Sequence, residues 1–307
     1  MAQHPLRIPA PARPTLPSSA QKEEASRWFQ NLQDRFIEMF EALDGGTFNR
    51  KSWKRDTNSA RPVAASAGAS AEGMAQKEDG GGGTMALLKG RLFEKAGVNF
   101  SEVHGTFSEE FRKQIPGSEK DGTFWAAGLS MVIHPAHPKV PAMHMNTRHI
   151  VTSHGWFGGG GDLNPVFPDA EDTALFHGAL KQALDAFDPG YYPRYKQWCD
   201  EYFFIPHRNR ARGVGGIFYD YHDSGDWGRD FALTRAVGEA VLKVYPQIVK
   251  RHMNEPFTSE EREQQLVWRG YYAEFNLVYD RGTKFGLATG GNTEAILMSL
   301  PPEAKWP

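Results

Sequence analysis

The segment from Lys196 to Asp220 brings aromatic rings, a histidine, arginines and glycines close together in the sequence. Aromatic faces suit a flat ligand, and guanidinium groups bind carboxylates through paired hydrogen bonds. Glycines such as Gly215 and Gly216 let the backbone approach a ligand closely. These residue types indicate a site for a flat ligand that carries carboxylates. A buried strand at 202–205, followed by a solvated arginine loop, is the other interpretation.

A second group of polar residues follows a proline-rich bend after Ser130 and His134. In residues 142–151, His144, Asn146 and Arg148 alternate with less polar side chains. A period of two predicts a strand whose three polar groups share one face and can reach the same ligand. Histidine can transfer a proton near neutral pH, and arginine pairs with carboxylates. The alternative is a strand face that is simply exposed to water.

Two further motifs place a carboxylate next to glycine or arginine. Four glycines at 158–161 precede Asp162, and they would allow a tight turn to hold that carboxylate against a ligand. A surface turn capped by Asp162 is the commoner outcome for such sequences. Near the C-terminus, Asp280 is followed by Arg281 and Gly282, which could form only a hairpin turn.

Taken together, these motifs closely resemble those of the oxygen-dependent coproporphyrinogen III oxidase family. The resemblance covers roughly residues 90–300 and is strongest at 196–220 and 272–287. It implies oxidative decarboxylation of two propionates of coproporphyrinogen III to vinyl groups, which gives protoporphyrinogen IX in haem biosynthesis. Dioxygen is the implied electron acceptor and co-substrate.

The resemblance also implies roles for individual residues. His144 would transfer a proton, and Asp280 would contact the pyrrole nitrogens, with Asp162 as second choice. Arg148, Arg212 and Arg281 would hold propionates. The implied substrate-binding positions are Ser130, Asn146, Thr147, Arg148, Arg212, Gly290, Gly291 and Asn292. The resemblance implies glutamate where Arg210 stands, so a carboxylate that would brace Arg208 or Arg212 is missing here. It implies arginine where Asn292 stands, and an amide should bind a carboxylate more weakly.

No flavin motif is present, and the single Cys199 excludes a cysteine-cluster metal site. We therefore expect no required cofactor. A divalent metal is an alternative, because family positions place histidines at His134, His144, His177 and His207. Ordinary hydrogen-bonded histidines are the simpler expectation. A catalytically silent tetrapyrrole carrier and a histidine-based metal hydrolase are the rival functions.

Helical periodicity predicts helices at 23–44, 171–187, 229–252 and from 258 through 266, with Pro246 kinking or ending the third. A capping box is expected at Thr258. Strands are predicted at 124–134, 142–151, 272–279, 285–289 and 295–300, and a mobile loop or active-site lid at 64–84. The predicted fold is α+β, with a large antiparallel sheet flanked by helices on both faces. A single domain at 23–307 follows a disordered, proline-rich arm at 1–22.

The formal net charge of −2 gives no electrostatic argument for a nucleic-acid partner. No apolar run is long enough for stable insertion into a membrane. The resemblance implies a homodimer formed through the C-terminal strands at about 272–307. The protein is expected to be cytoplasmic, with a mitochondrial location as the alternative, because the N-terminal arm lacks acidic residues.

Overall fold

The computed structural model describes residues 16–55, 80–107, 109–113, 115–288 and 292–306. Its centre is a seven-stranded antiparallel sheet whose strands follow each other in chain order, with β9 added at one edge. In spatial order the strands are β1 (Asn49–Lys54), β2 (Gly80–Leu88), β3 (Phe93–Thr106), β4 (Thr123–Pro135), β5 (Ala142–Val151), β6 (Gly155–Asn164) and β9 (Gly215–His222). The predicted α+β class and large antiparallel sheet are confirmed.

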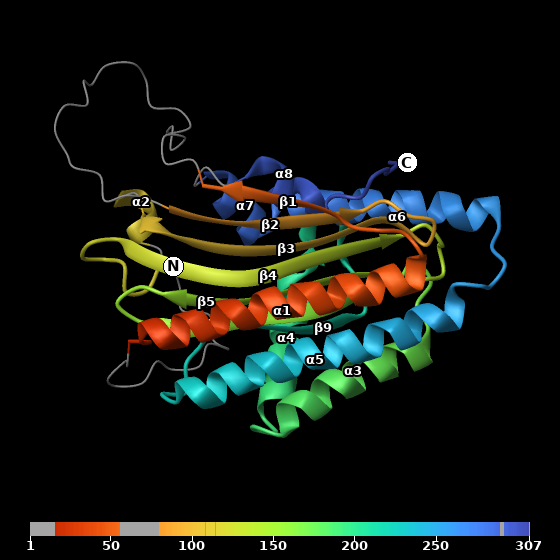
Figure 1. Ribbon diagram of the computed structural model, residues 1–307. Coiled ribbons are helices and arrows are strands. Elements are labelled where there is room, and N and C mark those ends of the chain that lie inside the picture. Colours follow the sequence, from red (N-terminus) through yellow and green to blue (C-terminus); the bar gives the residue numbers. More distant parts are fainter. Residues whose placement is uncertain (1–15, 56–79, 108, 114, 289–291, 307) are drawn as a thin grey trace, which may run out of the picture.

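Helices cover both faces of the sheet (Figure 1). One face carries α1 (Ser19–Asp44), α5 (Trp227–His252) and α3 (Ala170–Asp185). On the other face lie α6 (Ser259–Val278), α7 (Arg281–Ala288), α8 (Thr293–Ile296) and the 3-10 turn η2 (Leu297–Ser299). Helix α4 (Tyr191–Tyr202) packs against β9. The remaining short elements are α2 (Glu109–Arg112), β7 (Phe204–Ile205), η1 (Pro206–Arg208) and β8 (Arg210–Ala211).

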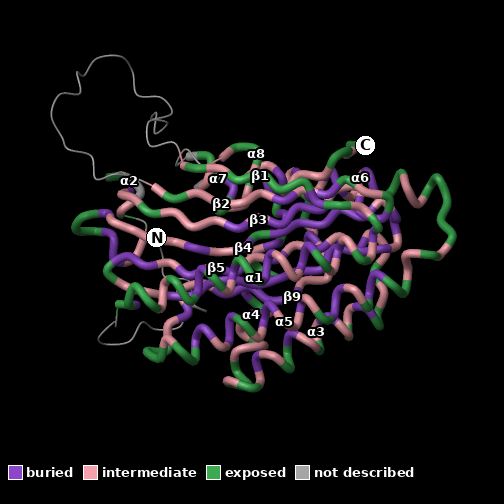
Figure 2. The backbone as a smooth tube through the Cα atoms, viewed as in Figure 1, coloured by how far each residue is buried: buried purple, intermediate pink, exposed green. Residues whose placement is uncertain are grey.

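The main core lies between the sheet and the α1–α5 layer, where Figure 2 shows the buried residues gathered inside. Phe29, Phe36 and Phe40 of α1 are fully buried, as their spacing along a helix predicts. Helix α5 packs beside α1 and continues through Pro246 to His252, which confirms the helix predicted at 229–252; of the two effects expected of Pro246, an end near Tyr245 is wrong. A smaller second cluster of buried, mostly aromatic side chains lies on the opposite face and consists of Trp198, Cys199, Phe203, Ile205, Phe218 and Phe275.

The three predicted C-terminal strands are wrong. The capping box at Thr258 is present, but the helix it starts continues to Val278, and α7 and α8 follow. Leu266, Ala273 and other residues spaced three, four and seven apart are buried, so a helical stripe overrides the β-preference of the aromatic residues there.

The predicted loop at 64–84 is wrong at its end, where Gly80 begins β2. A Cβ atom on Gly82 would lie 2.2 Å from the Trp53 carbonyl oxygen, and one on Gly83 would lie 2.1 Å from that of Phe100. The glycines therefore allow close strand pairing rather than a loop. Residues 64–79 and most of the predicted arm lie outside the described residues, and α1 already begins at Ser19.

Candidate active site

The predicted alternation along β5 is confirmed. His144, Asn146 and Arg148 lie half-buried on the face that carries α6, whereas their neighbours in sequence point to the main core. Thr147 is one of those neighbours and is 1% exposed. Strand geometry therefore places Thr147 on the opposite face from the other predicted substrate residues.

Strand pairing brings further predicted residues to the same face. Ser130 of β4 lies opposite Asn146, and Asp162 of β6 lies opposite His144. Ser130 is exposed, while Asp162 is 1% exposed. The glycine run before Asp162 belongs to β6, so the expected tight turn is wrong.

Asp162 forms a buried ion pair with Arg212, which is 2% exposed. The guanidinium Nη2 lies 2.7 Å from Asp162 Oδ1, and Nε lies 3.1 Å from Oδ2. Burial alone would raise the pKa of Asp162, but the Arg212 charge and hydrogen bonds from His144 and Arg212 lower it to about 2. Asp162 therefore stays ionised, and Arg212 is already neutralised by a carboxylate of the protein itself.

His144 is oriented by that same carboxylate. Its Nδ1 lies 2.8 Å from Asp162 Oδ1, and because a carboxylate only accepts hydrogen bonds, Nδ1 carries the hydrogen. The Nε2 atom points to the Asn146 amide nitrogen at 3.4 Å. An aspartate that fixes the imidazole tautomer in this way leaves Nε2 as the atom that can exchange a proton.

The series of hydrogen-bonded polar side chains that runs from Arg212 through Asp162, His144 and Asn146, here called the polar chain, continues to the edge strand β9. Arg148 Nη1 donates to Asn146 Oδ1 at 2.9 Å, and Nη2 pairs with Asp220 Oδ2 at 3.0 Å. A Cβ atom on Gly158 would lie 2.7 Å from Asp220 Oδ1, so the glycine leaves room for this pair. We call Ser130, His144, Asn146, Arg148, Asp162 and Asp220 the sheet-borne half of the site.

Asp220 was not singled out from the sequence. It lies on the site face two residues after Phe218, as ordinary strand alternation requires, and a β-bulge follows where the pairing of β6 with β9 shifts register between Phe157 and Gly159. Tyr221 adopts a left-handed conformation there, with φ of 55°, and its N–H donates to Asp220 Oδ1. The alternation of Ile217 and Tyr219 with Phe218 and Asp220 is the signal in the sequence that could have placed Asp220 on this face.

Asp280 and Arg281, the helix-borne half of the site, lie at the start of α7. Asp280 Oδ2 accepts the Thr283 N–H at 2.7 Å, which caps the helix, and Oδ1 accepts the Tyr202 hydroxyl at 2.9 Å. Within the part of the chain that the structure describes, Asp280 makes no ion pair. Arg281 is exposed, and its guanidinium lies 5.0 Å from the centre of the Tyr202 ring.

The third predicted substrate segment is only partly described. Gly290 and Gly291 lie outside the described residues. Asn292 is the N-cap of α8, and its side-chain oxygen accepts the Ala295 N–H at 3.1 Å. The asparagine that replaces the family's arginine therefore has a structural role in this chain.

Arg210, the other departure, stacks over the rings of Trp268 at 4.3 Å and Tyr271 at 4.6 Å. The glutamate absent from this position is not needed to brace its neighbours. Arg208 pairs with Glu274, and Arg212 pairs with Asp162. The substitution therefore leaves both neighbouring arginines with a carboxylate partner.

The four histidines considered as metal ligands do not converge. His134 Nε2 lies 2.9 Å from the Ser299 carbonyl, and burial lowers the pKa of His134 to about 3, so it is neutral. His177 contacts Tyr192 and the Val214 carbonyl, while His207 contacts Tyr279 and Glu274. Each imidazole, His144 included, has its own hydrogen-bond partners.

One carboxylate and histidine cluster, among the described residues, has a spacing that a metal could use. It consists of Asp169, Asp172 and His252. Arg251 Nε lies 2.8 Å from Asp172 Oδ1, and His252 Nε2 lies 2.6 Å from Oδ2. A guanidinium thus already supplies the positive charge, and the cluster joins α3 to α5.

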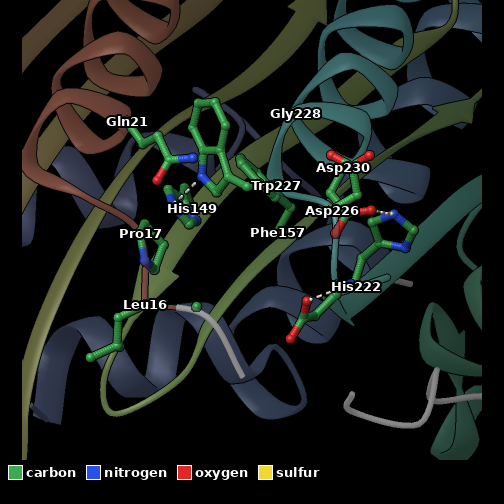
Figure 3. A pocket seen from close by; sticks show the side chains of 13 residues that line it. Leu16, Pro17, Gln21, His149, Phe157, His222, Asp226, Trp227, Gly228 and Asp230 are labelled. Carbon is green, nitrogen blue, oxygen red and sulfur yellow. Dashed lines mark hydrogen bonds and ion pairs between the residues drawn. The ribbon is translucent and has the colours of Figure 1, made fainter. Parts of the chain in front are cut away.

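A cavity of about 370 Å³ lies on the α1–α5 side of the sheet (Figure 3). His149 and Trp227 lie next to each other in its lining, joined by a 3.1 Å hydrogen bond from the indole Nε1 to His149 Nε2. His222 pairs with Asp230 at 2.9 Å beside them. None of the predicted site residues that the structure describes lines this cavity. It is therefore separate from the polar chain on the opposite face.

No helix within the described residues has both the length and the apolar character needed to cross a membrane.

Comparison with known proteins gives one consistent result. The sequence model of a family described as "Coproporphyrinogen III oxidase" matches residues 24–307. A curated "Oxygen-dependent coproporphyrinogen-III oxidase" from Rickettsia bellii is 51% identical over 93% of this chain and 98% of its own length. Proteins of the same name from Rickettsia akari and Rickettsia africae are 53% and 52% identical over the same shares.

Proposed function

The chain belongs to the coproporphyrinogen III oxidase family, and from that premise we propose how its site carries out the reaction. The protein is an oxygen-dependent coproporphyrinogen III oxidase of haem biosynthesis. It converts two propionates of coproporphyrinogen III to vinyl groups, with release of carbon dioxide, and the product is protoporphyrinogen IX. Each conversion also releases one proton and two electrons, and dioxygen accepts the four electrons.

Asp280 is the base that contacts the pyrrole nitrogens in our proposal. Its two hydrogen bonds come from neutral donors, the Tyr202 hydroxyl and the Thr283 N–H. Asp162 is less suited to this role, because Arg212 holds its pKa at about 2 and covers both carboxylate oxygens. Removal of a pyrrole proton leaves an electron-rich ring, which can reduce dioxygen.

His144 transfers a proton through Nε2, and Asp162 keeps that imidazole in the required tautomer. Arg148 and Arg281 bind propionates, since Arg281 is exposed and Arg148 is only partly buried. Arg212 acts differently from the sequence-based prediction. Its buried pairing with Asp162 favours a role in holding the carboxylate rather than the substrate.

We further propose that dioxygen is the co-substrate and that no metal is required. The separate hydrogen-bond partners of His134, His177 and His207 support this proposal. Residues 23–307 act as one catalytic domain, and the protein is a homodimer. In its proposed C-terminal contact region, about 272–307, the described residues contain the end of α6, α7, α8 and η2, with no strand among them. Sedimentation at micromolar concentration tests the dimer.

The polar chain from Arg212 through Asp162, His144 and Asn146 to Arg148 is the observation that carries the proposed mechanism. It places a proton-transfer group and a carboxylate-binding group on one face. The test incubates purified protein with coproporphyrinogen III in air, under strict anaerobiosis, and in air with a chelator. Product formation only with oxygen, unaffected by chelation, is expected. Binding without turnover would instead support the carrier function.

A further inference from the structure

Tyr202, the last residue of α4, lies between the sheet-borne and helix-borne halves of the site. Its ring stacks on Phe218 of β9 with 4.5 Å between centroids and a 5° angle between planes. Phe275 of α6 meets the same ring edge-on at 5.9 Å. The guanidinium carbon of Arg148 lies 5.9 Å from the centre of the Phe218 ring, on which Tyr202 stacks. The Tyr202 ring is thus packed against β9 of the sheet and against α6, the helix that ends shortly before Asp280.

The Tyr202 hydroxyl contacts two consecutive residues of the helix-borne half. It donates to Asp280 Oδ1 at 2.9 Å and accepts the Arg281 N–H at 3.1 Å. Burial raises the pKa of Tyr202 to about 12, and the Asp280 charge acts in the same direction. The hydroxyl therefore remains protonated near neutral pH and serves as a donor to Asp280.

We propose that Tyr202 is a positioning residue that fixes Asp280 and Arg281 relative to the sheet-borne half of the site. The inference rests on the proposed function, in which Asp280 and Arg281 contact the substrate. Asp280 caps a helix of eight residues, and its other side-chain contact, to Thr283, is within the same helix end. The hydroxyl of Tyr202 instead links the carboxylate to α4, and through the ring to the sheet.

The test uses Tyr202→Phe, which keeps the ring on Phe218 and removes only the hydroxyl. We expect kcat to fall about tenfold, the effect of losing one hydrogen bond to a charged group, with little change in KM. In an Asp280→Asn background the same substitution is expected to change kcat less than about twofold, because Tyr202 acts through Asp280.

The matched control is Tyr245→Phe, whose hydroxyl donates to the Pro141 carbonyl at 2.9 Å in the main core. That variant is expected to keep the kcat of the parent protein. A Tyr202→Phe protein with parental kcat, or one with an undiminished loss in the Asp280→Asn background, would overturn the inference.

A second measurement does not depend on turnover. The melting temperatures of Tyr202→Phe, Asp280→Asn and the double variant test whether the two side chains are coupled. Non-additive shifts support the positioning role, and additive shifts overturn it. If the parent protein itself lacks oxygen-dependent turnover, the proposed function fails. The melting temperatures of the single and double variants still show whether Tyr202 and Asp280 are coupled.

Discussion

The sheet-borne and helix-borne halves of the site hold their carboxylates in opposite ways. Asp162 lies within a central strand pairing, is buried, and is covered by Arg212 and His144. Asp280 lies at a helix terminus, is half-buried, and accepts hydrogen bonds from a hydroxyl and a backbone N–H. The first carboxylate is committed to orienting protein groups, whereas the second has capacity left for a ligand.

This difference matches the two proposed roles, a structural charge for Asp162 and a reactive one for Asp280. A buried carboxylate that loses its cation partner is costly, because desolvation is no longer compensated. A half-exposed carboxylate at a helix N-terminus contributes to stability mainly as a cap. Substitutions in the two halves should therefore affect different measurements.

The largest effect is expected for Asp162→Ala, which leaves the Arg212 guanidinium buried without its counter-charge. The free energy of unfolding should fall by about 3–5 kcal/mol, the range for breaking a buried ion pair. Urea denaturation measures this loss. The matched variant Asp280→Ala should lose only about 1 kcal/mol, as for a helix cap. Equal losses in the two variants would remove the distinction between the halves.

Asp280→Asn should leave the fold intact and lower kcat by about 10²-fold or more, because the amide cannot accept a proton as a carboxylate does. Asparagine still caps a helix, so stability should change little. Steady-state kinetics on the folded variant provide the measurement. A near-normal kcat would mean that the base is another residue, and Asp280 would then not differ from Asp162 in reactivity.

The pH dependence of the free energy of unfolding should reveal the contribution of the buried Asp162 carboxylate. The folded-state pKa of Asp162 is about 2, below its ordinary value of 3.8. Its contribution is therefore present above pH 5 and is lost as the pH falls towards 2, amounting to about 2 kcal/mol. Urea denaturation between pH 5 and 2, compared with the same series for Asp162→Asn, checks this. Parallel curves for the two proteins would contradict it.

The smallest effect is expected for Asn292→Arg, which restores the family's residue. Loss of the α8 cap should cost about 1 kcal/mol of stability, while a new positive charge at this predicted substrate-binding position should lower KM severalfold. Thermal unfolding and KM for coproporphyrinogen III are the two measurements. An unchanged KM would indicate that residue 292 does not contact a propionate in this chain.

Local patterns predicted much of the fold. The two-residue alternation along 142–151 placed His144, Asn146 and Arg148 on one face, and the three-and-four spacing predicted α1, α3 and α5. The strands predicted in the C-terminal region were wrong, because aromatic residues that favour strands also fill the buried side of α6. The loop predicted at Gly80–Gly83 was wrong for a related reason, since glycine is found where strands pair closely as well as in loops.

The sequence by itself determined the family, the antiparallel sheet and most of the charged residues of the site, because periodicity and motif spacing are local properties of the chain. Only the tertiary structure decided which charges neutralise one another. Arg212 and Asp162 are far apart in the sequence, as are Tyr202 and Asp280. Whether an arginine binds substrate or a buried aspartate depends on strand register and on helix packing, which bring distant residues into contact.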